Sequence, residues 1–150
     1  MYKKLIDDAG GPAGEPLAAK RGRPSPVAVL VVEDEELVRL NATTMLAALG
    51  YLVREACCAP TALEQLRLHP EVSALFTDID MPGAFDGLAL AHKVHLLRPD
   101  IYLILTSGRT RPGSGQLCGG DFLPKPYSDQ TLADLICAAT EGSPEGGPRT

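Results

Sequence analysis

Long apolar segments, an excess of basic residues and paired cysteines are all missing from this sequence of 150 residues. No apolar run approaches the roughly 20 residues that a membrane-spanning helix needs. The N-terminus, MYKKLIDDAGG, has basic residues but lacks the apolar region that follows them in a signal peptide. We therefore expect a soluble, cytoplasmic protein that has no membrane partner.

The charge balance argues against a protein that wraps nucleic acid. Lysine and arginine number 14 against 19 aspartate and glutamate residues, which gives a net charge of -5. One short stretch, Lys20-Arg21-Gly22-Arg23-Pro24, resembles the core of an AT-hook, an arm that places arginines in a narrow minor groove. A single match within a leader rich in glycine and proline favours a solubilising tail over DNA contact.

The four cysteines, Cys57, Cys58, Cys118 and Cys137, do not have the spacing of a metal or disulfide site. Paired CxxC motifs, which are typical of zinc sites, are absent, and no disulfide framework is evident. We expect reduced and mostly buried thiols.

The chain divides into one domain and two flanking segments. Residues 1–26 contain many prolines and glycines and few large apolar residues, so core burial would not offset the entropy lost on ordering them. Residues 141–150 have the same composition. We predict a flexible leader, a single folded domain at 27–140 and a disordered tail.

Within the domain, short apolar runs alternate with stretches of helical period, a pattern typical of βα units wound into a parallel sheet. Strands are predicted at 27–32, 52–56, 72–77, 101–106 and 121–123. The first, third and fourth are almost continuously apolar, as strands covered on both faces must be. The fold class is therefore α/β, with a doubly wound, five-stranded parallel sheet.

Helices are predicted after most strands. The first has an apolar stripe that ends at Gly50 and consists of Leu37, Leu40, Thr44, Ala47 and Ala48. A second contains Leu63 and Leu66, a third covers about 88–97, and the last begins after Ser128 as N-cap. Residues 109–120 have one proline and four glycines, so the fourth helix of the series should be short, frayed or absent.

Polar residues follow four of the strands, at the sheet edge where ligands bind in such folds. They are Glu33 and Asp34, Asp78, Thr106 and Ser107, and Lys125. Clustered carboxylates repel one another unless one is protonated or a hard cation such as Mg²⁺ lies between them. A carboxylate can then attack a phosphoryl group, while a lysine and a hydroxyl stabilise the phosphoryl oxygens.

Four motifs occur in order: VLVVEDEE, LFTDIDMPGAFDG, ILTSG and FLPKPY. With them, residues 27–140 resemble the receiver domains of response regulators in two-component systems, the CheY-like superfamily with a flavodoxin-like (βα)5 fold. Only one helix and a tail are predicted after Asp129, so we expect the stand-alone type, which transmits its signal through a partner. The resemblance implies signalling rather than enzymatic turnover, with a histidine kinase or phosphotransfer protein upstream and an unidentified protein target downstream.

The resemblance also implies roles for individual residues. Asp78 corresponds to the phosphoacceptor. Glu33, Asp34, Asp78 and the main-chain carbonyl of Asp80 correspond to the ligands of Mg²⁺ or Mn²⁺.

Three further residues correspond to the switch of the family: Thr106, Lys125 and Phe122. A phosphoryl group adds charge that Thr106 and Lys125 move to meet, and the ring of Phe122 fills the space that Thr106 leaves. The resemblance further implies a cis bond between Lys125 and Pro126.

Some features depart from the common receiver pattern. The carboxylate of Asp80 can point toward the phosphoryl group and alter its lifetime, and Ser107 and Gly108 are further candidate modulators. Residues 83–85 lengthen the loop after Pro82 by one residue. The weak fourth helix puts in doubt the output face that it forms in much of the family.

Two alternatives belong to other classes. Asp78 and Asp80 form a DxD motif that also resembles haloacid-dehalogenase-type phosphatases, but here the acidic pair lies upstream and no cap domain follows Lys125. A flavodoxin-like nucleotide binder would need a glycine-rich phosphate loop after the first strand, and none is present.

Overall fold

The computed structural model describes residues 26–140, which form a five-stranded parallel sheet with the order β2-β1-β3-β4-β5. The strands are β1 (Ala28–Val32), β2 (Leu52–Ala56), β3 (Val72–Asp78), β4 (Tyr102–Ser107) and β5 (Asp121–Pro124). Each lies within one residue of its predicted bounds, and the parallel α/β fold is confirmed. The predicted leader and tail fall outside the described residues, apart from residue 26, as does the AT-hook-like stretch.

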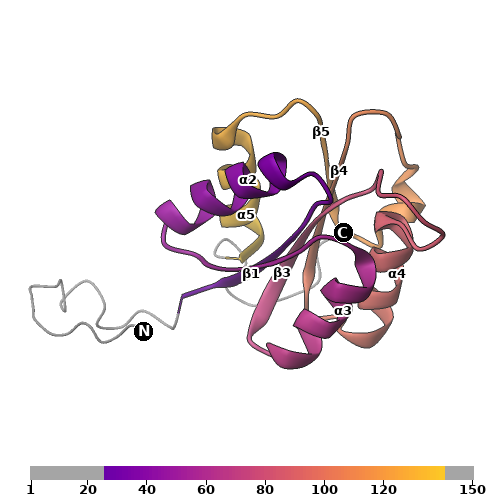
Figure 1. Ribbon diagram of the computed structural model, residues 1–150, viewed down its shortest axis with the longest axis horizontal. Helices are drawn as coiled ribbons and strands as arrows, with labels where there is room; N and C mark the ends of the chain where they lie inside the picture. The colour runs from indigo at the N-terminus through magenta and orange to yellow at the C-terminus, as the bar shows by residue number, and fades with distance from the viewer. Residues whose placement is uncertain (1–25, 141–150) are drawn as a thin grey trace, which may run out of the picture.

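Helices cover both faces of the sheet (Figure 1). They are α2 (Glu36–Ala48), α3 (Ala59–Leu68), α4 (Gly87–Leu97) and α5 (Asp129–Thr140). In Figure 1, α2 and α5 lie on one side of the strands and α3 and α4 on the other, and each pair is in contact. None of the helices in residues 26–140 has the length and apolar content to cross a membrane.

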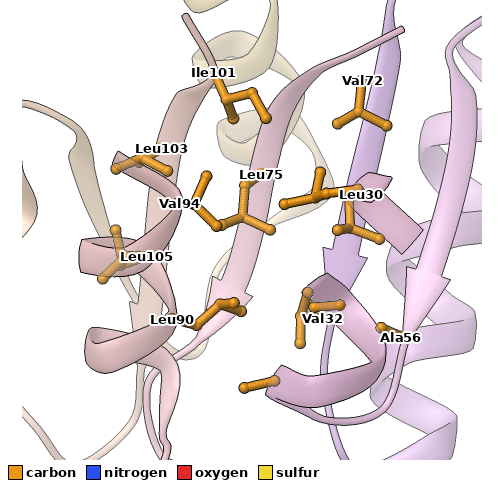
Figure 2. Packing of buried hydrophobic residues seen from close by; sticks show 14 of the residues in the cluster. Leu30, Val32, Ala56, Val72, Leu75, Leu90, Val94, Ile101, Leu103 and Leu105 are labelled. Carbon is orange, nitrogen blue, oxygen red and sulfur yellow. The ribbon is translucent and has the colours of Figure 1, made fainter. Parts of the chain in front are cut away.

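Successive side chains of β1 point to opposite faces of the sheet, and they are apolar on both, so both faces must be covered by helices. Leu30 and Val32 pack in the cluster beneath α3 and α4, whereas Val29 and Val31 pack in the cluster beneath α2 and α5. Figure 2 shows the first cluster, in which leucine and valine side chains from the helices and from neighbouring strands meet. Successive strand residues therefore serve two hydrophobic cores, which hold the sheet edge above them in place.

The predicted buried face of α2 is wrong. Ala42 and Leu46 are the buried residues of this helix. The residues of the predicted stripe are exposed instead: Leu37, Leu40, Thr44, Ala47 and Ala48. Both stripes repeat with the period of a helix, so periodicity alone does not decide which of them faces the sheet.

The fourth helix of the series is reduced to a four-residue 3₁₀ turn, η1 (Ser114–Leu117), which confirms the prediction of a degenerate helix. After η1, a side chain on Gly120 would overlap the carbonyl oxygen of Leu103, so β5 approaches β4 where only glycine fits. The cap of α5 is confirmed, because Ser128 Oγ accepts a hydrogen bond of 3.1 Å from the amide of Thr131.

No disulfide links the four cysteines, which all lie within residues 26–140, but the expectation that most are buried is wrong. Cys57 and Cys137 are exposed, and Cys58 and Cys118 are half-buried. Cys57 and Cys58 lie in the short connection between β2 and α3, and Cys137 lies on the outer side of α5, so none of the three points into a core.

Candidate functional site

Four adjacent strands bring the predicted polar residues to one sheet edge. Asp78 is the last residue of β3 and pairs in register with Thr106 of β4. Glu33 directly follows β1, and Lys125 directly follows β5. Because β1, β3, β4 and β5 are neighbours in the parallel sheet, their carboxyl ends meet on the same side.

Three carboxylates form the centre of this edge. Oxygen atoms of Glu33, Asp34 and Asp78 all lie within 4.8 Å of one another. Glu33 and Asp78 are each only 4% exposed, whereas Asp34 is exposed. Burial, together with the negative charge of Asp78, raises the pKa of Glu33 to about 7. The cluster consists of hard oxygen donors that repel one another, so it fits a divalent cation that prefers oxygen ligands.

Lys125 supplies positive charge to the buried carboxylates. Its Nζ lies 3.2 Å from Glu33 Oε1 and 3.4 Å from Asp78 Oδ2. Burial opposes the ammonium charge, but the charges of Asp78 and Glu33 outweigh it, and the pKa of Lys125 is raised. The bond between Lys125 and Pro126 is cis, as the resemblance implies. Gly108 lies beside the aliphatic stem of Lys125, where an added Cβ would be 3.7 Å from the lysine Cβ.

Two consecutive buried hydroxyls at the end of β4 differ in their partners. Thr106 is 1% exposed, and its Oγ1 has no hydrogen-bond partner. Ser107 donates to a carboxylate oxygen of Asp80 and accepts from the amides of Arg109 at 3.0 Å and Thr110 at 2.6 Å. The unsatisfied hydroxyl is therefore on the residue that pairs in register with Asp78.

Asp80 is held on two sides. Its amide donates to Asp78 Oδ1 at 3.1 Å, while its carboxylate accepts from the hydroxyls of Ser107 and Thr110, the latter at 2.6 Å. Burial would raise the pKa of Asp80, but the hydroxyl donors of Ser107 and Thr110, together with the backbone amide and the charge of Arg109, outweigh it, and the pKa is lowered. The carboxylate is thus bonded to the segment after β4, a contact that the sequence analysis did not foresee.

The aromatic switch candidate also has an unforeseen partner. Phe122 is half-buried in β5 and packs against the core beneath α3 and α4. The guanidinium carbon of Arg111 lies over its ring, 5.9 Å from the ring centre. A basic residue in a glycine-rich segment gives no sequence signal for such a contact, because only the fold brings Arg111 beside the Phe122 ring.

A pocket of about 490 Å³ opens beside the carboxylates. Its lining includes the acidic residues Asp34, Asp80 and Asp86 together with Arg109 and Thr110. The volume suits a small molecule or the end of a partner side chain, and it adjoins the acidic cluster.

Comparison with known protein families covers most of the chain. Residues 29–137 match the family described as "Response regulator receiver domain". The chain is 36% identical to the sensor kinase CckA of Brucella abortus (strain 2308) over 142 residues, which are 91% of this chain and 15% of that protein. It is 34% identical to nodulation protein W of Bradyrhizobium diazoefficiens over 119 residues, 75% of this chain and 51% of that protein.

Solved structures show the same architecture. The receiver domain of the hybrid histidine kinase CckA is 32% identical, with a TM-score of 0.66 over 76% of this chain and 99% of that one. A CheY-like receiver domain protein of Methanospirillum hungatei JF-1 is 23% identical, with a TM-score of 0.71 over 82% of this chain and 100% of that one. The second likeness concerns the fold alone.

The matched relatives are longer than this chain, which spans 15% of the CckA kinase and about half of nodulation protein W. These comparisons give no support to the haloacid-dehalogenase alternative. The match over residues 29–137 and the shared fold establish that the chain belongs to the response regulator receiver domain family of two-component phosphorelay signalling.

Proposed function

We propose that this protein accepts a phosphoryl group on Asp78, with Mg²⁺ or Mn²⁺ held by Glu33, Asp34, Asp78 and the main-chain carbonyl of Asp80. The observation that carries the proposal is the position of the Asp78 carboxylate. It is buried, lies within 4.8 Å of the oxygens of two other carboxylates, and is 3.4 Å from the ammonium of Lys125. A cation there would neutralise the cluster and supply charge that binds phosphoryl oxygens.

The chain's own groups have complementary tasks in the transfer. An oxygen of Asp78 attacks phosphorus as the donor's leaving group departs, and Lys125 offsets the charge of the phosphoryl oxygens. The hydroxyl of Thr106 has no partner before the reaction, so it is free to donate to a phosphoryl oxygen. Movement of Thr106 would then open space for Phe122, which changes the surface around β4 and β5.

The proposed partners follow from the family and from the relatives' names. The phosphoryl donor is a sensor histidine kinase or a histidine phosphotransfer protein in the cytoplasm, and the switched surface binds a downstream protein. The chemistry is limited to phosphorylation of this chain and its reversal, without turnover of an external substrate. Nucleic acid and membranes are not among the proposed partners.

Intact-mass measurement after incubation with acetyl phosphate and Mg²⁺ tests the proposal. The wild type should gain one phosphoryl group, whereas Asp78→Asn and wild type with a chelator should not. Asp134→Asn, which alters an exposed carboxylate on α5, is the matched control and should gain the group normally. An equal gain in Asp78→Asn would contradict the proposal, and steady hydrolysis of phosphate esters would favour a phosphatase.

A further inference from the structure

Residues 108–113 connect β4 to η1. The side chain of Asp80 ties this segment to the carboxyl edge of the sheet, where Asp78 lies. The carboxylate of Asp80 accepts from the hydroxyls of Ser107 and Thr110, so it holds the last residue of β4 and the third residue beyond it. We call these two hydrogen bonds the Asp80 tie. Both involve an ionised acceptor, which makes them stronger than bonds between neutral groups.

The tie is reinforced within the segment itself. Ser107 Oγ accepts from the amides of Arg109 and Thr110 while its own hydrogen is donated to Asp80, so its bonding capacity is filled. Ser107 is 2% exposed, and an alternative partner from solvent is therefore out of reach. Residues 107–110 thus form a closed turn that is anchored to the loop after β3.

The tie lies between the two candidate moving parts of the receiver. Thr106, whose hydroxyl has no partner, directly precedes Ser107. Arg111, whose guanidinium covers the ring of Phe122, directly follows Thr110. A displacement of the anchored turn must therefore move both the hydroxyl of Thr106 and the ring of Phe122.

We propose that Asp80 is a positioning residue that holds residues 107–110 in place through its tie to Ser107 and Thr110, and so restrains the movement of Thr106 and Phe122. This inference rests on the proposed phosphorylation of Asp78. Phosphorylation draws Thr106 toward the new charge. The tie opposes this movement, because it holds the adjacent Ser107 in its unphosphorylated position. Loss of the tie lowers the free energy of the switched state relative to the unswitched one.

The charge of Asp80 offers a competing explanation for any effect of mutating it, because a carboxylate beside the phosphoacceptor repels phosphoryl oxygens. Thr110→Val separates the two explanations. It removes one hydroxyl of the tie, keeps the shape of the side chain and leaves the Asp80 charge in place. Thr110→Ser restores the hydroxyl and is the conservative rescue.

Phosphorylation rates with acetyl phosphate and Mg²⁺ provide the first test. We expect Thr110→Val and Asp80→Asn each to accelerate phosphorylation by about fivefold to tenfold, about the net effect of one hydrogen bond. Their combination should accelerate it by clearly less than the product of the two single effects, because Thr110→Val removes one hydrogen bond of the tie and Asp80→Asn replaces its charged acceptor with a neutral one. Thr110→Ser should behave as wild type. Thr43→Val, which removes an exposed hydroxyl bonded to the Leu40 carbonyl on α2, is the control and should change nothing.

Ring signals of labelled phenylalanine give a second readout, which a purely structural role would not change selectively. The chain has three phenylalanines, so Phe122 can be assigned by substitution. In unphosphorylated Thr110→Val we expect the Phe122 signal to shift or split while that of Phe76, which packs beneath α2 and α5, stays in place. Thr110→Ser should restore the wild-type signal.

Three results would overturn the inference. One is acceleration by Asp80→Asn with a wild-type rate in Thr110→Val, which would assign the effect to charge. The second is a multiplicative effect in the double variant, and the third is an unchanged Phe122 signal. A wild type that gains no phosphoryl group would instead refute the proposed function, and the Phe122 signal of the unphosphorylated variants would still decide whether the tie positions the turn.

Discussion

The interior of the sheet and its carboxyl edge are both buried, but by opposite chemistry. In the interior, Leu30, Leu75 and Ile104 are fully buried and surrounded by other apolar side chains. At the edge, the carboxylates of Glu33 and Asp78 lie close together, yet both residues are only 4% exposed. Burial of the apolar interior stabilises the folded state, whereas burial of the carboxylates at the edge destabilises it.

This difference shows which part of the molecule maintains the fold and which part is kept for chemistry. An edge that buries carboxylates and the unpartnered hydroxyl of Thr106 persists because the two cores beneath it supply the stability. Substitutions in the interior should therefore reduce stability and leave the chemistry intact. Substitutions at the edge should impair the chemistry and leave the stability unchanged or higher.

The largest effect on stability is expected from Leu75→Ala in the interior. The side chain is fully buried in the cluster shown in Figure 2, so its removal should lower the free energy of unfolding by about 2–5 kcal/mol. Urea unfolding measures the loss, and mass measurement of the folded fraction should still show phosphorylation. A loss below about 1 kcal/mol would mean that the interior is not the source of stability that we infer.

Gly87→Ala affects the boundary between the two regions. A Cβ at this position would overlap the main-chain oxygen of Asp78 and lie 2.7 Å from the Cα of Ile79. We expect a loss of about 1–3 kcal/mol in unfolding free energy together with slower phosphorylation, because the displaced backbone carries Asp78, the proposed phosphoacceptor. Gly115→Ala is the matched control, since nothing lies within 4 Å of its added Cβ. Equal behaviour of the two variants would contradict the close packing at Gly87.

Glu33→Gln should weaken metal binding and stabilise the metal-free protein. The pKa of Glu33 is raised to about 7, so above that pH its buried charge opposes folding, and glutamine lacks this charge. At pH 8 with a chelator the melting temperature should rise, while Mg²⁺ affinity should fall about tenfold or more. Thermal unfolding across a Mg²⁺ titration measures both. If Glu33→Gln melts at a lower temperature than the wild type without metal, the buried charge of Glu33 does not destabilise the fold.

Thr106→Val should have the smallest effect on stability. The variant keeps the shape of the side chain and removes a buried hydroxyl without a partner, so the free energy of unfolding should stay the same or rise by up to about 1 kcal/mol. The phosphorylation-dependent change in the Phe122 signal should shrink. A clear loss of stability would mean that the hydroxyl has a structural partner in the unphosphorylated protein.

Much of the fold was predictable because strand signals are local. The almost continuous apolar runs of β1, β3 and β4 indicate strands covered on both faces, and residues 109–120 indicate a failed helix by their glycine and proline content. The orientation of α2 was not predictable. Two stripes on this helix share the helical period, and only the sheet beneath it selects Ala42 and Leu46 for burial.

The site was predictable to the extent that it depends on strand ends. Glu33, Asp78 and Lys125 meet because parallel strands bring their carboxyl ends together. The contacts of Thr110 with Asp80 and of Arg111 with Phe122 arise from the path of an irregular segment, which has no period to read. Sequence reasoning therefore found the carboxylates and missed the connection between them and the ring of Phe122.

Location of the phosphoryl group tests the central claim most directly. Borohydride reduction converts an aspartyl phosphate to homoserine, and tandem mass spectrometry of the peptides then identifies the modified residue. After treatment with acetyl phosphate and Mg²⁺, we predict conversion at Asp78 alone and none when a chelator is present. Conversion at Asp34 or Asp80, or conversion that is independent of the metal, would contradict the account.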